Sequence, residues 1–166
     1  MDRKEARKCD LYSLFAIDAA KQAIEDAAMD LDKEDKNRIG VIFASGIGGI
    51  KTFDEEVLSY AKIKDTIGPK FNPFFIPKMI SDIAAGHISM LYGFHGPNFA
   101  TVSACASSTN AISDAFNYIR LGKANVIITG GAEAAVSESG VGGFNSMNAL
   151  STRNDSPETA SRPFSA

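Results

Sequence analysis

The sequence is poor in cysteine and lacks any long apolar run, and each shortage excludes a class of protein. Cys9 and Cys105 are its only cysteines and no Cys-x-x-Cys pair occurs, which excludes a cysteine-rich zinc site and a disulfide framework. No apolar run approaches the ~20 residues that a membrane span needs. Residues 1–5 lack the apolar core of a signal peptide. These features predict a cytoplasmic protein with reduced thiols, away from the membrane.

Positive charge is not in excess either. The formal net charge is -3 and the pI is about 5.4, whereas a nucleic-acid binder usually carries a basic stripe and a high pI, so a nucleic-acid partner is not expected. The 166 residues are 45% hydrophobic, enough to bury one sizeable core, and the length predicts a single domain. The chain opens on a charged helical run and stops without completing a terminal element, which predicts a fragment of a longer protein.

Strand patterns alternate with helix patterns along the chain. The first helix is expected over residues 10–29, with Asp10 as its cap. Residues 66–76 are rich in glycine, proline and phenylalanine and are expected to be irregular, and the tail from Val136 is rich in glycine, serine and asparagine with short apolar pieces. This alternation predicts an α/β layered fold with a largely parallel sheet. Further helices are expected at 51–60, 77–92 and 107–121, and strands at 38–44, 99–104 and 125–129.

Cys105 stands where a predicted strand runs into a predicted helix. The helix end supplies unpaired N–H groups, which favour a thiolate, and a sharp turn would project the side chain. The small neighbours Ala104, Ala106 and Ser107 leave room for a substrate carbonyl, and the Cys105 N–H is a candidate donor to its oxyanion. The alternative is an ordinary buried cysteine at a helix start, the commoner fate of a free cysteine. Spacing alone favours that alternative.

The segment Thr101-Val-Ser-Ala-Cys105-Ala-Ser-Ser is similar to the active-site motif of β-ketoacyl-(acyl carrier protein) synthases. The resemblance covers essentially the whole chain and is strongest to the type II elongating enzyme of fatty-acid synthesis. A related subfamily of chain-length partners lacks the cysteine, so Cys105 favours a catalytic subunit. Eight further segments match in order: Ser45-Gly-Ile-Gly-Gly49, Asn72-Pro-Phe-Phe-Ile-Pro77, Ala85-Gly-His87, Gly96-Pro97, Gly130-Gly-Ala-Glu133, Gly140-Val-Gly-Gly-Phe144, Ala149-Leu-Ser-Thr-Arg-Asn154 and Ser161-Arg-Pro-Phe164.

The resemblance implies a thiolase-like fold, layered α-β-α-β-α and built from two similar halves. Residues 1–166 would be a partial amino-terminal domain, without the opening strand and without the second half, which carries two catalytic histidines, a lysine and a gating phenylalanine loop. In the family, the cysteine accepts an acyl group from the acyl carrier protein. The histidines then assist decarboxylation of malonyl-carrier, whose carbanion attacks the thioester to give 3-oxoacyl-carrier. This chemistry needs no metal or organic cofactor, and the chain alone is expected not to complete it.

The resemblance also implies roles for other residues. The acyl-contact residues would be Ile47, Phe75, Ala104, Gly140 and Phe144, with Phe75 and Phe144 near the acyl pocket or a dimer contact. The residues that dock the acidic acyl carrier protein would be Lys4, Arg7, Lys8 and Lys70, although position 69, often basic in relatives, is Pro69. The first three share one face if their stretch is helical, and the alternative is a solvated charged face. A homodimer would pair the strand near Phe99–Ser103 with its twin.

Other patterns are weaker. The turn Ser45–Gly49 does not match a phosphate-binding loop, because Ser45 and Ile50 stand where glycines are required. The resemblance places Ile47 of this turn along the acyl pocket, and the alternative is a plain glycine turn. His87 shares a face with apolar residues and is expected to be a hydrogen-bonded core histidine, and His95 is expected at the far end of the strand from Cys105. The alternatives for the whole chain are a polyketide-type or thiolase-like condensing enzyme, or a non-catalytic fragment that folds or dimerises.

Overall fold

The computed structural model describes residues 2–165 and divides the chain into two compact units, the first ending at Ala135 and the second beginning at Val136. The first unit holds the sheet and the second holds one helix, α7 (Glu138–Ser146), and a short 3₁₀ turn, η3 (Pro157–Thr159). Each unit is described by itself. Among residues 2–165, no helix combines the length and the apolar character that crossing a membrane requires.

A parallel sheet forms the centre of the first unit. Its strands are β1 (Ile39–Ala44), β2 (Asn98–Phe99) and β3 (Val126–Gly131), in the order β2-β1-β3. The register pairs Val41 with Asn98, and β1 with β3 along its whole length. Because all three strands run in one direction, their carboxyl ends lie at one edge of the sheet. The predicted α/β fold with a parallel sheet is therefore confirmed for this part of the chain.

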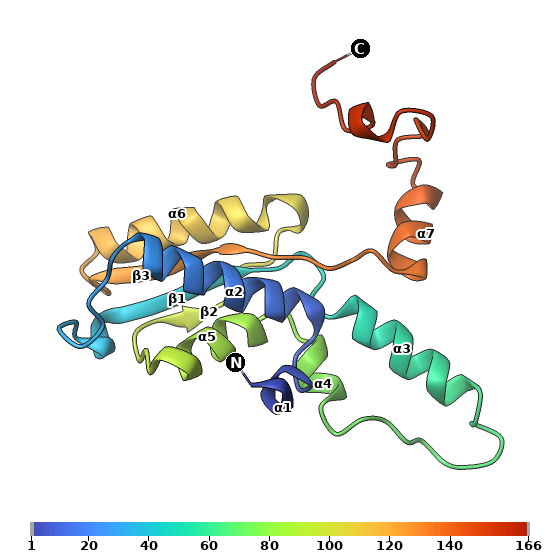
Figure 1. The fold of residues 1–166 in the computed structure, drawn as a ribbon, viewed down its shortest axis with the longest axis horizontal. Helices are drawn as coiled ribbons and strands as arrows, with labels where there is room; N and C mark the ends of the chain where they lie inside the picture. Colours follow the sequence, from blue (N-terminus) through green and yellow to red (C-terminus); the bar gives the residue numbers. More distant parts are fainter. Residues whose placement is uncertain (1, 166) are drawn as a thin grey trace. The chain divides into compact units, whose positions relative to one another are not determined.

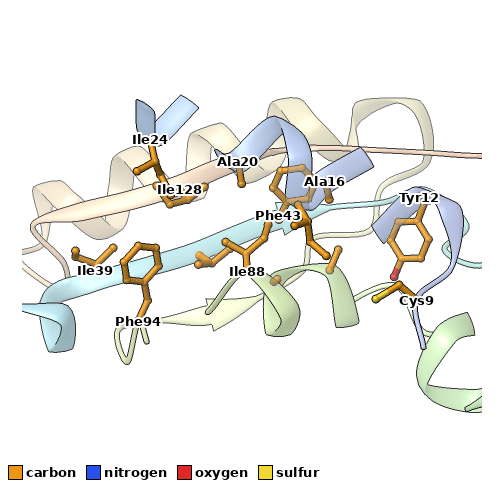
Figure 2. Packing of buried hydrophobic residues seen from close by; sticks show 14 of the residues in the cluster. Cys9, Tyr12, Ala16, Ala20, Ile24, Ile39, Phe43, Ile88, Phe94 and Ile128 are labelled. Atoms are coloured by element: carbon orange, nitrogen blue, oxygen red, sulfur yellow. The ribbon is translucent and has the colours of Figure 1, made fainter. Parts of the chain in front are cut away.

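Helices cover both faces of the sheet (Figure 1). Helices α2 (Leu11–Asp26) and α5 (Ile83–Tyr92) pack on one face, and α6 (Ser107–Arg120) packs on the other. Every β1 residue is buried, and its side chains alternate between the faces. Val41 and Phe43 join the core formed with α2 and α5, while Ile42 and Ala44 pack against α6. Figure 2 shows the larger of these two cores.

Short elements connect these layers. Helix α1 (Arg3–Ala6) precedes α2, and the 3₁₀ turn η1 (Lys36–Arg38) leads into β1. Helix α3 (Ile50–Ala61) follows β1, and α4 (Phe75–Met79) packs against α3. The 3₁₀ turn η2 (Ala104–Ala106) leads into α6. Asp10 caps α2 as predicted, because its side chain accepts a hydrogen bond from the Tyr12 N–H.

The single helix predicted over residues 77–92 is wrong, because two helices, α4 and α5, occupy this stretch. The chain leaves the helical conformation at Ile80, which is extended at φ -66° and ψ 140°. There the Tyr12 hydroxyl of α2 donates to the Ile80 carbonyl oxygen, which an uninterrupted helix would have used internally. A tertiary contact thus holds the break. The predicted end of the stretch is correct, since Gly93 is left-handed at φ 70°.

Two further expectations need correction. The predicted strand 99–104 is shorter, because pairing to β1 ends at Phe99 and the Thr101 hydroxyl instead donates to the Ser107 carbonyl. The tail, for which no helix was predicted from the sequence, contains helix α7. Its cap is Ser137, whose hydroxyl accepts a hydrogen bond from Gly140 N. Three glycines within α7 mask the helical pattern, since glycine is unfavourable in a helix interior.

Candidate active site

Cys105 lies in the 3₁₀ turn η2, two residues before α6 begins. The turn is sharp, because Ala104 adopts a left-handed conformation at φ 51°, a region that non-glycine residues rarely occupy. Cys105 is exposed, whereas Cys9 is buried with 6% of its surface accessible. Of the two thiols, only Cys105 is therefore presented to a reactant. It also lies next to the amino-terminal end of a 14-residue helix.

The buried side chain of Ser107 holds this turn together. Its hydroxyl donates to the Ala104 carbonyl at 2.7 Å and accepts from the Ser103 N–H at 2.8 Å. Asn110, one turn further along α6, donates to the Ser103 hydroxyl at 2.6 Å. These bonds tie both sides of Cys105 to α6, so the strained turn is supported from within its own segment. Sequence reasoning treated Ser107 only as a small neighbour and did not single out Asn110.

A second turn, Ser45–Gly49, lies at the same edge of the sheet, directly after β1. Glu133, which follows β3, accepts hydrogen bonds from the Ser45 hydroxyl at 3.0 Å and from the N–H groups of Gly46 and Ile47 at 2.8 and 2.9 Å. Gly48 is left-handed at φ 83°. A side-chain carbon added at Gly46 would lie 3.5 Å from the Ala104 carbonyl oxygen, so the glycine turn sits against the Cys105 turn.

The family model for the amino-terminal domain of β-ketoacyl synthases matches residues 1–166. The chain belongs to the β-ketoacyl synthase family. It is 44% identical over 164 residues to the 3-oxoacyl-(acyl-carrier-protein) synthase 2 of Staphylococcus aureus, covering 99% of this chain and 40% of the relative. The corresponding Synechocystis protein is 42% identical over 164 residues, with 99% and 39% covered. The chain thus spans about two fifths of the length of these relatives.

Solved structures agree with the family assignment. A β-ketoacyl synthase from Burkholderia phymatum superposes with a TM-score of 0.83 at 29% identity, covering 99% of this chain and 40% of that one. A type II polyketide ketosynthase, solved in complex with its acyl-carrier protein and bound to the hexaketide, superposes with a TM-score of 0.78 at 25% identity, covering 87% of this chain and 40% of that one. The expected thiolase-like fold is confirmed for the amino-terminal portion of such an enzyme.

Among the predicted β-ketoacyl synthase site residues, the turns that carry Ile47 and Ala104 lie against each other. Ile47 belongs to the glycine turn that faces Ala104 and is 42% exposed. Phe75 stands in α4, with its ring centroid 5.1 Å from that of Phe71 and 6.2 Å from that of Phe53. Gly140 and Phe144 lie in α7, which belongs to the other unit, so their predicted place beside the acyl group stays a prediction.

An open depression of about 350 Å³ also lies on the α6 side of the Cys105 turn, and none of the predicted acyl-contact residues lines it. Its walls are mostly polar, which does not suit an acyl chain. It is lined by Thr101, Val102, Ser103, Asn110, Ser113 and Asp114. We therefore do not assign it to the acyl group.

The N-terminal basic cluster, Lys4, Arg7 and Lys8, differs from the shared helical face that the spacing indicates. Helix α1 ends at Ala6, so Arg7 and Lys8 lie beyond it. Lys8 pairs with Glu5 at 2.6 Å, and its ammonium also lies 5.7 Å from the centroid of the Phe74 ring. Lys4 and Arg7 are exposed, as is Lys70 in the loop before α4. Carrier docking at this cluster stays a prediction, with Lys8 already engaged within the chain.

Both histidines lie where the sequence placed them. His87 is half-buried in α5, with its Nε2 atom 3.5 Å from the Cys9 sulfur, and burial lowers the pKa of His87 while raising that of Cys9. The expected hydrogen-bonded core histidine is therefore confirmed. His95 is exposed in the turn before β2, at the opposite end of that strand from Cys105. Within residues 2–165, no group of three or more histidine, cysteine or acidic side chains is placed to hold a metal ion.

Proposed function

We propose that this chain is the cysteine-bearing amino-terminal part of an enzyme that elongates fatty acids by decarboxylating condensation. The single observation that carries the proposal is Cys105, exposed in a sharp turn before α6 in a chain that belongs to the β-ketoacyl synthase family. The names of the Staphylococcus and Synechocystis relatives support the choice of a 3-oxoacyl product.

The first step is acyl transfer. The Cys105 thiolate attacks the carbonyl carbon of an acyl thioester on the carrier protein, and a carbon–sulfur bond forms as the carbonyl π electrons move to oxygen. The Cys105 N–H has no acceptor among residues 2–165, so it is available to the oxyanion. Collapse of the tetrahedral intermediate expels the carrier thiolate and leaves the acyl group on Cys105.

The second step joins the chains. Malonyl-carrier loses carbon dioxide, and the resulting enolate attacks the Cys105 thioester to release 3-oxoacyl-carrier and the free thiolate. The developing enolate charge needs positioned donors. His87 contacts Cys9 in the core and His95 lies before β2, so neither is placed to supply them. We infer that these donors come from a second half of the enzyme and that residues 1–166 alone do not complete the condensation. No cofactor takes part.

The proposed partner is an acyl carrier protein, loaded with acyl or malonyl groups and docked on the N-terminal basic cluster and Lys70. The polyketide ketosynthase neighbour, solved with an acyl-carrier protein, supports this choice. The proposed assembly is a cytoplasmic homodimer. It is supported by residues 100–103, which follow the edge strand β2 and have no strand partner among residues 2–165.

Mass spectrometry of the full-length enzyme after brief exposure to acyl-carrier thioester tests the proposal. We expect one acyl adduct on Cys105 and none on Cys9, because Cys9 is buried and burial raises its pKa. Release of labelled carbon dioxide from malonyl-carrier should then require the acylated Cys105. Equal labelling of the two thiols, or acylation that survives Cys105→Ala, would overturn the assignment. Turnover of fatty acyl but not polyketide thioesters would separate the proposed pathway from its polyketide alternative.

A further inference from the structure

Glu133 ends the Gly130-Gly-Ala-Glu133 segment, a part of the chain to which the proposed mechanism gives no role. It stands two residues after β3, at the edge of the sheet where the Cys105 turn and the glycine turn lie. Its side chain reaches across to the residues that follow β1. Oε1 accepts from the Ser45 hydroxyl, and Oε2 accepts from two successive backbone N–H groups, those of Gly46 and Ile47.

The hydrogen-bond donors to this carboxylate come from the glycine turn and not from a cationic side chain. Within residues 2–165, no lysine or arginine forms an ion pair with Glu133. Hydrogen bonds from N–H groups to a carboxylate are roughly twice as strong as those between neutral groups. Two consecutive N–H groups that converge on one oxygen form a nest, an arrangement suited to an anion. Glu133 therefore fixes the backbone of Gly46 and Ile47.

The Ser45 hydroxyl extends this control along the turn. It donates to Glu133 and at the same time accepts from the Gly48 N–H at 2.8 Å. Ser45 is buried, with 2% of its surface accessible. The Gly49 N–H then donates to the Met79 carbonyl at 3.0 Å. The turn is thus held by Glu133 at its start and by α4 at its end.

The fixed turn lies between Glu133 and the Cys105 turn. A side-chain carbon added at Gly46 would lie 2.8 Å from Glu133 Oε2 on one side and 3.5 Å from the Ala104 carbonyl oxygen on the other. Ala104 is the left-handed residue that directs the chain into Cys105. A movement of the glycine turn would therefore remove a neighbour of the backbone before Cys105, which its hydrogen bonds to Ser107 and Asn110 do not replace.

We propose that Glu133 is a positioning residue for acyl transfer: its carboxylate clamps the turn 45–48 against Ala104 and so fixes the approach to the Cys105 thiolate. The inference rests on the proposed function, because acyl transfer to Cys105 is its readout. Glu133 acts through the backbone of the glycine turn and not by contact with the acyl group.

Three variants of the full-length enzyme test this role. Glu133→Ala removes every acceptor. Glu133→Gln keeps the shape, and its amide oxygen can still accept from the Gly46 and Ile47 N–H groups while its NH₂ donates to the Ser45 hydroxyl. Glu34→Ala is the matched control, since Glu34 is an exposed glutamate with no hydrogen bond or ion pair among residues 2–165. Each is assayed by single-turnover acylation of Cys105, well below its measured unfolding temperature.

We expect Glu133→Ala to slow acylation at saturating acyl-carrier by about tenfold, the equivalent of one hydrogen bond to a charged group. KM for the carrier should stay unchanged, and Glu133→Gln should recover to within about threefold of the wild-type rate. A purely structural role would lower the unfolding temperature and leave the rate per folded molecule unaltered, which would overturn the proposal. So would an equal loss in Glu34→Ala or an alanine-like rate in Glu133→Gln. If wild-type enzyme failed to acylate Cys105, the proposed function would fall instead.

Discussion

Asp10 links two helices through one buried carboxylate, and its removal should cost more than the loss of an ordinary helix cap. One oxygen accepts from the Tyr12 N–H at 3.1 Å, in the first turn of α2. The other accepts from the Thr52 N–H at 3.0 Å and from the Thr52 hydroxyl at 2.6 Å, in the first turn of α3. Asp10 and Thr52 are each buried, with 3% of their surface accessible. Because α3 begins directly after the glycine turn, Asp10 also anchors the far end of that turn.

The cost of Asp10→Ala follows from these three bonds. Loss of a helix cap is worth about 1 kcal/mol. The Thr52 N–H and hydroxyl would be left buried without their acceptor, at about 1 kcal/mol or more each. We therefore expect the free energy of unfolding to fall by about 3 kcal/mol. Thr52→Val removes only the hydroxyl bond and should cost about 1 kcal/mol, a loss that should nearly vanish once Asp10 is alanine.

Denaturant unfolding of the full-length protein, with hydrogen exchange at the amides of α3, measures these effects. Asp2→Ala is the matched control, because Asp2 also accepts from two backbone N–H groups at a helix start, but it is exposed and caps only the four-residue α1. It should cost well under 1 kcal/mol. A loss of less than about 1 kcal/mol in Asp10→Ala, or additive effects of Asp10→Ala and Thr52→Val, would refute the reasoning.

Two further predictions address docking and the glycine turn. Replacing all three residues of the N-terminal basic cluster with glutamate should raise KM for acyl-carrier about tenfold at low salt. This corresponds to a loss of binding free energy of about 0.5 kcal/mol for each substituted residue. The rate of Cys105 alkylation should not change. The control is Lys33→Glu, which breaks the Lys33–Asp30 ion pair, one comparable to that between Lys8 and Glu5. An unchanged KM in the cluster variant would mean that these residues are only a solvated charged surface. Gly48→Ala should destabilise the fold by about 1–2 kcal/mol or more, because the backbone is left-handed at φ 83° and the added side-chain carbon would lie 2.5 Å from the Met79 carbonyl oxygen. Gly68→Ala, in open space, should be near neutral in the same unfolding assay.

The elements that the sequence predicted well are those whose own residues determine them. The apolar run of β1 is buried on both faces, and α6 ends where Gly122 takes a left-handed φ of 66°. The predicted helix over 77–92 was wrong because its break depends on the Tyr12 hydroxyl, more than sixty residues away along the chain. Helix α7 was missed because its glycines lower helix propensity while its cap, Ser137, gives a local signal that the prediction did not use.

The candidate site was predicted unevenly for a similar reason. Cys105 could be found from its motif and its place before a helix. Glu133 could not be connected to Ser45 from sequence, because their hydrogen bond spans 88 residues and depends on β1 and β3 being neighbours in the sheet. Strand order is a tertiary property. A pattern of alternating strands and helices predicts parallel pairing but not which strand ends meet.

The same contact decides what the glycine turn can bind. A glycine-rich turn after a buried strand resembles a phosphate-binding loop, whose function depends on free N–H groups that converge on an anion. In this chain the N–H groups of Gly46 and Ile47 converge on Glu133, and that of Gly48 points to the Ser45 hydroxyl. A phosphate would have to displace a carboxylate held by three hydrogen bonds, and the negative charge of Glu133 would repel it. The sequence mismatch at Ser45 and Ile50 and the occupied nest therefore lead independently to one conclusion. The turn is a support for the Cys105 segment and not a nucleotide site.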